Sequence, residues 1–302
     1  MEFLKKETHF DFMGKRNLFI GISLAFIVFS ALVFVTRGLK FGIDFAGGTE
    51  IQVKFLKPLD SLQIRKLLTE AGYLDSSVQH FGKEESGEYL VRLEESGSGF
   101  QSVAQKLLPL FTRVVGEGNA QIEKVEIVGP RVGGDLKKRG AWALFYSLLG
   151  ILIYVAIRFD YRFSPGGVVA LIHDVIISLG VFAFFGKRFD LTILAAVLTI
   201  IGYSINDTIV IFDRIRENIK KHQGLDIAAI VNRSVNETLS RTILTGLTTF
   251  FMLLALFFFG GEVIHDFAFI MLVGMVVGTY SSIFIASPVF LYLHRRTEKK
   301  LS

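Results

Sequence analysis

The sequence contains no cysteine and only five prolines. The absence of cysteine excludes disulfide bonds and thiolate metal ligands, and it removes redox chemistry as a guide to the compartment. The scarcity of proline and of low-complexity sequence argues against a disordered tail. The GxxxxGK[ST] phosphate loop, the HExxH zinc motif and the GxSxG nucleophile motif are missing as well. The sequence therefore predicts no enzyme, no cofactor and no metal site.

Apolar residues are abundant instead: they make up 51% of the 302 residues, and phenylalanine occurs 30 times. A soluble domain of this size has no core that could bury so many long apolar runs. The first run resembles the start of a signal peptide, but it is long for one and no A-x-A cleavage site follows it. The runs that approach or exceed the ~20 residues needed to cross hydrocarbon are Leu18–Val35, Trp142–Ile157, Pro165–Phe185, Leu191–Phe212, Thr242–Phe259 and Phe267–Leu293. We predict an α-helical polytopic membrane protein with six transmembrane helices.

The lysines and arginines lie beside the apolar runs and form no patch of their own, which argues against nucleic-acid binding despite the net charge of +5. If the N-terminus is cytoplasmic, most cations lie on the inner side, and the short outer loops hold only Lys187 and Arg188. Lys137–Arg139 would then lie outside, but long domains cross a membrane largely regardless of charge. We predict a multi-pass protein with both termini in the cytoplasm.

The polar segment between the first two runs shows a strand–helix–strand–strand–helix–strand order. This order predicts a small α+β domain with a ferredoxin-like fold on the outer face. Its expected elements are strands over Glu50–Phe55, Val78–Phe81, Tyr89–Leu93 and Ile122–Val128, a helix capped by Asp60, and a helix over Ser102–Val115. The predicted division is 1–36 for the N-terminus and first helix, 37–139 for this domain, 140–294 for a five-helix membrane bundle, and 295–302 for a cytoplasmic tail.

The loop 213–240 shows helical periodicity of its own. Gly224 suits the end of one short amphipathic helix, and Asp226 can cap a second. The two predicted helices lie either at the cytoplasmic interface of the membrane or packed on the bundle.

Asp207 is the strongest candidate for a functional residue. It lies inside the fourth apolar run, where a carboxylate costs ~2.5–3.5 kcal/mol on insertion scales and therefore needs a partner or a function. Thr199, Tyr203 and Asn206 are placed on a similar face, so we expect a polar stripe that points into the bundle. The alternative is a carboxylate that only ties helices together.

Arg241 is the expected partner of Asp207, because it opens the fifth run and lies at similar depth. Thr238, Thr242, Thr245 and Thr249 give the same helix a face of hydroxyl groups, which can bond to other helices or line a hydrated path. The alternative is an arginine that anchors the helix end by reaching to water.

Two further groups of residues lie in the third and sixth runs. His173 and Asp174 are adjacent ionisable residues near the middle of a helix, where they either handle protons or form a fixed hydrogen-bond network. Gly274, Gly278 and Ser282 recur with Ala286 at every fourth residue, and such small residues allow close helix packing.

Several motifs resemble a known family. They are Phe41-Gly42-Ile43-Asp44-Phe45-Ala46-Gly47-Gly48-Thr49, Val128-Gly129-Pro130-Arg131-Val132-Gly133, His173-Asp174-Val175-Ile176, and the run from Ile201 to Val210, which ends in Asn206-Asp207-Thr208-Ile209-Val210. They are similar to the SecD and SecF protein-export subunits, and Asp213-Arg214-Ile215-Arg216-Glu217-Asn218 is typical of the SecF branch.

The resemblance implies a member of the RND superfamily in the bacterial cytoplasmic membrane. Such a chain pairs with a SecD-like subunit, joins the Sec translocon channel, and uses proton-motive force to promote export of unfolded polypeptide. The transmembrane carboxylate of the family maps to Asp207 and its arginine to Arg241, while SecD supplies a further acidic residue. The competing hypotheses are an RND-type exporter of small molecules or lipids and a non-transporting membrane scaffold.

Overall fold

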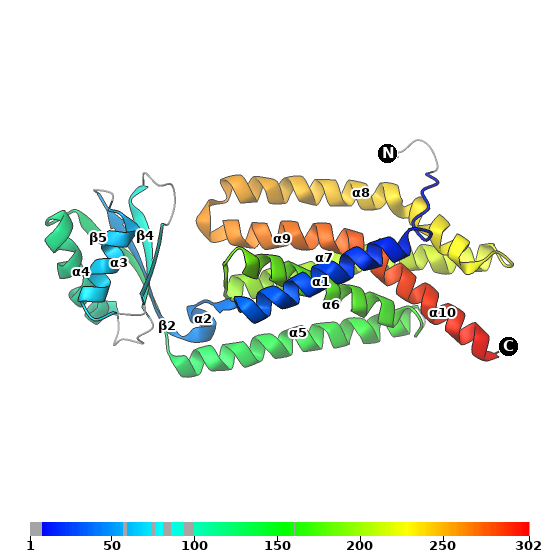
Figure 1. Ribbon diagram of the computed structural model, residues 1–302, viewed down its shortest axis with the longest axis horizontal. Coiled ribbons are helices and arrows are strands. Elements are labelled where there is room, and N and C mark those ends of the chain that lie inside the picture. Colours follow the sequence, from blue (N-terminus) through cyan, green and yellow to red (C-terminus); the bar gives the residue numbers. More distant parts are fainter. Residues whose placement is uncertain are drawn as a thin grey trace. The chain divides into compact units, whose positions relative to one another are not determined.

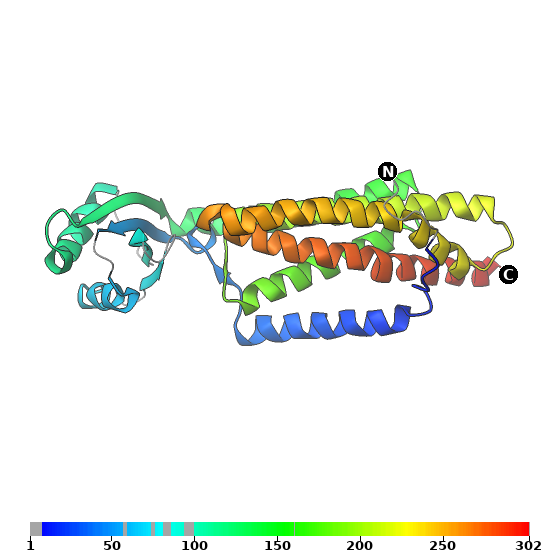
Figure 2. The same cartoon turned by 90° about the horizontal axis from the view of Figure 1, so that it is seen from above.

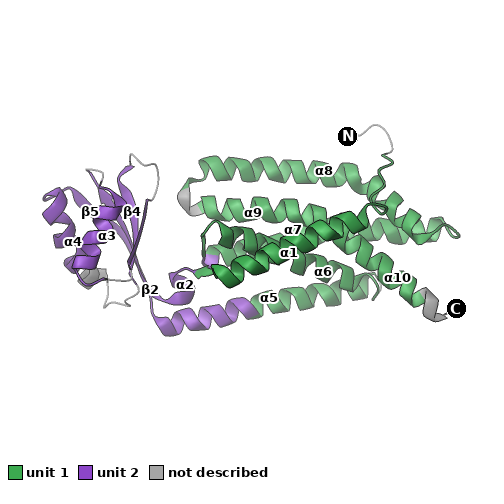
Figure 3. Cartoon of the chain, in the orientation of Figure 1, with its two compact units in different colours: residues 1–40, 142–188, 192–302 green, residues 41–141, 189–191 purple. Residues whose placement is uncertain are grey.

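The computed structural model describes residues 8–56, 59–73, 76–80, 86–93, 100–159 and 161–301. The chain divides into two compact units, coloured separately in Figure 3. The membrane unit comprises residues 1–40, 142–188 and 192–302, and the α+β unit comprises residues 41–141 and 189–191.

The α+β unit contains a four-stranded antiparallel sheet with the order β3-β4-β2-β5. Its elements are β2 (Gly48–Phe55), α3 (Ser61–Glu70), β3 (Ser76–His80), β4 (Glu88–Leu93), α4 (Phe100–Val115) and β5 (Ala120–Val128). This element order and strand order are those of a ferredoxin-like fold, so the predicted fold class is confirmed. The expected end of the second strand, Phe81, lies outside the described residues.

The core of this unit follows from the period of two along β2. Ile51, Val53 and Phe55 are almost completely buried and pack with residues of α3 and α4 such as Leu68 and Phe111. Asp60 caps α3, because its side chain accepts a hydrogen bond of 3.1 Å from the Leu62 amide, as the sequence predicted.

Two of the recognised motifs pack on each other within the α+β unit. The short helix α2 (Ile43–Ala46) is followed by Gly47, which has φ +79°. A Cβ atom on Gly47 would lie 2.9 Å from Pro130 Cα, and one on Gly133 would lie 3.0 Å from the Gly47 nitrogen. Glycine is required at both positions because the two backbones touch. The motifs thus join the start of the sheet to the start of α5 (Pro130–Arg158).

The membrane unit is a bundle of long helices (Figure 1). These are α1 (Arg16–Thr36), α5, α6 (Ser164–Phe184), α7 (Leu191–Lys221), α8 (Ile227–Phe259), α9 (Gly261–Ser281) and α10 (Ser287–Leu301), with the π-helical turn η2 (Ser282–Ala286) joining the last two. The described residues contain six candidate spans, the last of them formed by α9, η2 and α10 together. The prediction of six transmembrane helices is therefore confirmed.

The helices pack in a defined order. In both views α8 and α9 run side by side (Figures 1 and 2). The α1 helix packs against α6 and lies along one flank of the bundle in Figure 2. The α7–α8 turn lies at the same end of the bundle as α10 (Figures 1 and 2), and Arg295 makes a bidentate contact with Asp226 there.

The segment 213–240 differs from the expected pair of separate short helices. Residues 213–221 continue α7 and residues 227–240 form the start of α8, without a break at either junction with the apolar run. Residues 203–223 contain no proline or glycine, so nothing ends the helix at the junction of Phe212 and Asp213. The predicted turn is present: Gly224 has φ +101°, and Asp226 caps α8 by accepting from the Ala228 amide at 3.2 Å.

Candidate functional site

Asp207 lies on α7 with only 9% of its surface exposed. Its Oδ1 atom accepts a hydrogen bond of 2.8 Å from Thr242 Oγ1 on α8. Its Oδ2 atom is buried and has no hydrogen-bond partner among the described residues. A buried carboxylate that is only half satisfied is costly, so this oxygen is a place where a proton can be held.

Arg241 does not form the ion pair with Asp207 that the sequence predicted. Arg241 is exposed, and no ion pair joins the two side chains in the part of the chain that the structure describes. The direct partner is the next residue of α8, Thr242, because successive helical residues point about 100° apart and only one of them can face α7.

The polar stripe predicted beside Asp207 points elsewhere. Thr199 and Asn206 are exposed on α7, and with Ala195 and Gly202 they form one continuous face. We call these four residues the small-residue face of α7. Tyr203 is half-buried and lies between that face and the core. The Asp207 side chain therefore points toward α8, whereas the Asn206 side chain points away from the chain.

His173 and Asp174 form a buried hydrogen-bond network. Asp174 Oδ1 lies 2.9 Å from His173 Nδ1, and Asp174 Oδ2 accepts bonds of 2.6 Å from Ser204 and 2.8 Å from Ser281. One carboxylate on α6 thereby holds α7 and α9. This arrangement favours the structural interpretation over proton handling for Asp174, although His173 Nε2 is buried without a partner among the described residues.

The small residues of α9 lie against α7. A Cβ atom on Gly274 would meet Ile200 Cδ1 at 2.3 Å, and one on Gly278 would meet Ser204 Cβ at 3.0 Å. Ser282 shares a hydrogen bond of 2.8 Å with Thr208 on α7. The α7 helix is thus packed on α9 along one side, which directs Asp207 toward α8.

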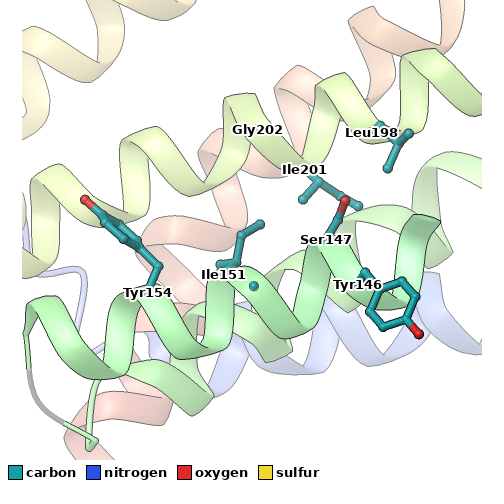
Figure 4. A pocket seen from close by; sticks show the side chains of 8 residues that line it. Tyr146, Ser147, Ile151, Tyr154, Leu198, Ile201 and Gly202 are labelled. Atoms are coloured by element: carbon teal, nitrogen blue, oxygen red, sulfur yellow. The ribbon is translucent and has the colours of Figure 1, made fainter. Parts of the chain in front are cut away.

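A shallow apolar groove of about 360 Å³ lies between α5 and α7 (Figure 4). Its walls include Ser147, Ile151 and Tyr154 from α5 and Leu198 and Ile201 from α7, while Gly202 forms part of its edge (Figure 4). It contains no charged side chain, so it offers no means of binding a charged substrate.

Sequence reasoning did not find Ser204, Ser281 and the partner role of Thr242. Ser204 gives no local signal, because its partner Asp174 is 30 positions away in the sequence. Ser281 gives none either, because it is 107 positions from Asp174.

Comparisons with known proteins agree with these features. The family model described as protein export membrane protein SecD/SecF, C-terminal, matches residues 110–296. The model of the SecD/SecF GG motif matches residues 32–58, which include the Gly47 contact described above. The chain belongs to the SecD/SecF family.

Similar SecD/SecF proteins include two curated relatives that are both named protein translocase subunit SecF. The relative from Calditerrivibrio nitroreducens is 46% identical over 99% of both chains. The relative from Magnetococcus marinus is 45% identical over 100% of this chain and 97% of its own.

Solved structures of SecDF share the fold. The crystal structure of SecDF from Thermus thermophilus, described as a translocon-associated membrane protein, has a TM-score of 0.85 and 37% identity. The match covers 96% of this chain but only 39% of that chain. SecDF in a super-membrane-facing form matches with a TM-score of 0.72 and 36% identity.

Proposed function

We propose that this chain acts as the SecF subunit of a SecDF-type complex in a bacterial cytoplasmic membrane. With a SecD-like subunit it would use proton-motive force to promote export of unfolded polypeptides through the Sec translocon. The assignment to SecF is supported by relatives of that name that match over nearly their whole length. The chain spans 39% of the SecDF chain it resembles, and we assign the rest of such a machine to the SecD-like subunit.

The observation that carries proton coupling is the environment of Asp207. One carboxylate oxygen is held by Thr242 and the other is buried without a partner among the described residues. A proton on that second oxygen would remove the buried charge, and loss of the proton would leave a charge whose one hydrogen-bond donor among the described residues is Thr242. A change in the position of α8 would move Thr242 relative to Asp207, which couples proton binding to shape.

The energy available is sufficient for such a cycle. Moving one elementary charge through 100 mV is worth about 2.3 kcal/mol, so a few protons per cycle can drive a conformational change. Lys and Arg placement supports cytoplasmic termini and an extracytoplasmic α+β unit. In this orientation the α7–α8 turn and α10 face the cytoplasm.

The test is the replacement of Asp207 by Asn, which retains an oxygen acceptor for Thr242 but cannot titrate. Export of a secreted precursor into inverted membrane vesicles would be measured with and without a proton gradient. The variant should fall to the rate measured without a gradient, and Asp207→Glu should retain part of the stimulation. Co-purification with the SecD-like subunit must equal that of the parent.

If Asp207→Asn exports as well as the parent when the gradient is present, the chain is a scaffold and Asp207 a structural residue. An RND-type exporter of small molecules or lipids is the other alternative. It predicts gradient-driven uptake of a dye or lipid into the same inverted vesicles in the absence of any precursor.

A further inference from the structure

The N-terminal segment Thr8–Met13, which we call the strap, is bound to α8 through its backbone. Asn236 Oδ1 accepts from the Phe10 amide at 2.9 Å, and its Nδ2 donates to the Phe10 carbonyl at 2.9 Å. Asn232 Oδ1 accepts from the amides of Phe12 and Met13 at 2.8 and 3.0 Å, and its Nδ2 also donates to the Phe10 carbonyl, at 3.0 Å. We call Asn232 and Asn236 the asparagine clamp.

The clamp recognises backbone rather than side chains. The two asparagines are four residues apart, so they stand one above the other on one face of α8. Each uses its amide as both acceptor and donor, as a neighbouring β-strand would. This arrangement satisfies three amides and one carbonyl of a segment that has no regular secondary structure of its own, apart from a turn.

Side chains of the strap secure it to the other end of the chain. Met13 is buried, with 2% of its surface exposed. Phe12 packs edge-on against Phe284 of η2, and Phe19 of α1 stacks on the same ring at 3.8 Å between centroids. Ser23 of α1 also shares a hydrogen bond of 2.9 Å with Tyr280 of α9. The strap therefore connects α8 to the α1–α9 side of the bundle.

The asparagine clamp lies close to Thr242 along α8. Thr242 follows Asn236 by six residues, or about 9 Å along the helix. The inner part of α8 is also held by α7, because Asn218 bonds to Ser234 and Glu237, whereas only 11% of its most apolar stretch is buried within the chain. The strap holds α8 close to the point at which Thr242 reaches Asp207.

We propose that the asparagine clamp, by binding the backbone of the strap, positions the inner half of α8 so that Thr242 faces Asp207. Asn232 and Asn236 are positioning residues in this scheme. The proposal rests on the proposed function for the role of Asp207, but the clamp itself is measured independently of export.

The experiment compares Asn232→Ala combined with Asn236→Ala against Asn17→Ala, in the SecDF-type complex reconstituted in lipid. Asn17 is exposed and makes no side-chain hydrogen bond among the described residues, so the same substitution is made without loss of a contact. Hydrogen exchange would be followed at the amides of Phe10, Phe12 and Met13 and across residues 238–242 of α8. In the clamp variant the three strap amides should exchange about tenfold faster or more, since each loses a hydrogen bond, and the α8 amides should also exchange faster.

A second readout separates positioning from general loosening of the fold. The pH dependence of gradient-driven export would be recorded for the clamp variant and for Thr242→Val. If the clamp positions Thr242, both variants shift the pH of half-maximal export in the same direction. A lower rate with an unchanged pH profile would overturn the positioning role, as would unchanged exchange in α8. If Asp207→Asn exports normally, the proposed function fails. Hydrogen exchange at the strap and at residues 238–242 then tests by itself whether the clamp positions α8.

Discussion

Two buried carboxylates in this chain have opposite hydrogen-bond environments. Asp174 is fully buried and receives three donors, from His173, Ser204 and Ser281. Asp207 receives one donor, from Thr242. A carboxylate with several fixed donors is held in one state and acts as a joint between helices, whereas one with an unsatisfied oxygen has a reason to change its protonation.

At Asp174 the expected effect is on stability. Asp174→Ala would leave the Ser204 hydroxyl and the His173 imidazole buried without this acceptor, while Ser281 keeps its bond to the Gly278 carbonyl, and each buried polar group left unsatisfied costs about 1–3 kcal/mol. The thermal midpoint of the purified protein should fall sharply. Ser178→Ala on the same helix is the control, because Ser178 Oγ is buried without a partner in the described part of the chain and its loss should be neutral or stabilising. Equal midpoints for the two variants would contradict the network.

At Thr242 the expected effect is on export. Thr242→Val keeps the shape of the side chain but removes the hydroxyl that donates to Asp207. It should reduce gradient-driven export while leaving expression and assembly intact. Thr245→Val is the matched control. Among the described residues the Thr245 hydroxyl bonds only to carbonyls of its own helix, so this variant should export like the parent. Similar export by both variants would argue against a role for the Asp207–Thr242 contact.

Between elements, packing depends on glycines that oppose small side chains. A Cβ atom on Gly180 of α6 would lie 2.1 Å from Ser30 Oγ and 2.9 Å from Ser30 Cα on α1. A neighbouring backbone cannot move aside as the end of a flexible side chain can, so α1 and α6 would have to separate. The distance between α1 and α6 at this point is therefore set by the small size of Gly180 and Ser30.

Gly180→Ala should lower the thermal midpoint, because it forces α1 away from α6. Gly150→Ala on α5 is the comparison, since a Cβ atom there meets nothing within 4 Å, and replacing a helical glycine by alanine is favourable by up to about 1 kcal/mol. Adding Ser30→Gly to Gly180→Ala should restore part of the midpoint. If Gly180→Ala alone is as stable as the parent, this result would contradict the close packing of α1 on α6.

The elements themselves were predictable where a local pattern specifies them. The six spans follow from the length of the apolar runs, and the Asp60 and Asp226 caps follow from residue type. The continuation of α7 beyond Phe212 was not predicted, because the sequence changes there from apolar to amphipathic and such a change resembles a helix boundary. Neither proline nor glycine interrupts the helix at this point. The direction of Asn206 and the asparagine clamp depend on contacts between distant segments, which helical periodicity alone does not contain.

At the scale of the whole molecule, the membrane unit has one end where the strap, the α7–α8 turn and α10 meet. The proposed topology places this end in the cytoplasm and the α+β unit outside. Because the chain has no cysteine, single cysteines can be introduced at the exposed residues Glu117 and Gln223. An impermeant maleimide added to intact spheroplasts should label Glu117→Cys but not Gln223→Cys. After permeabilisation it should label both variants. The reverse pattern would invert the topology.

The small-residue face of α7 is the surface from which a partner helix is expected to approach. Ala195, Thr199, Gly202 and Asn206 recur at spacings of four, three and four residues and are all exposed. Small and polar residues are poor at filling space against lipid tails but allow two helix backbones to pack closely and bond across the contact. A SecD-like half placed there would lie beside α7 near the level of Asp207.

Gly202→Leu should therefore prevent assembly without unfolding the chain. A Cβ atom on Gly202 meets nothing within 4 Å, so the larger side chain fits the isolated subunit, and its thermal midpoint should match that of the parent. Co-purification with the SecD-like subunit should fall strongly, because a close helix contact cannot accommodate leucine. Leu244→Ala on the exposed surface of α8 is the control and should assemble normally. Normal assembly of Gly202→Leu would mean that this face of α7 meets lipid and that the partner binds elsewhere on the bundle.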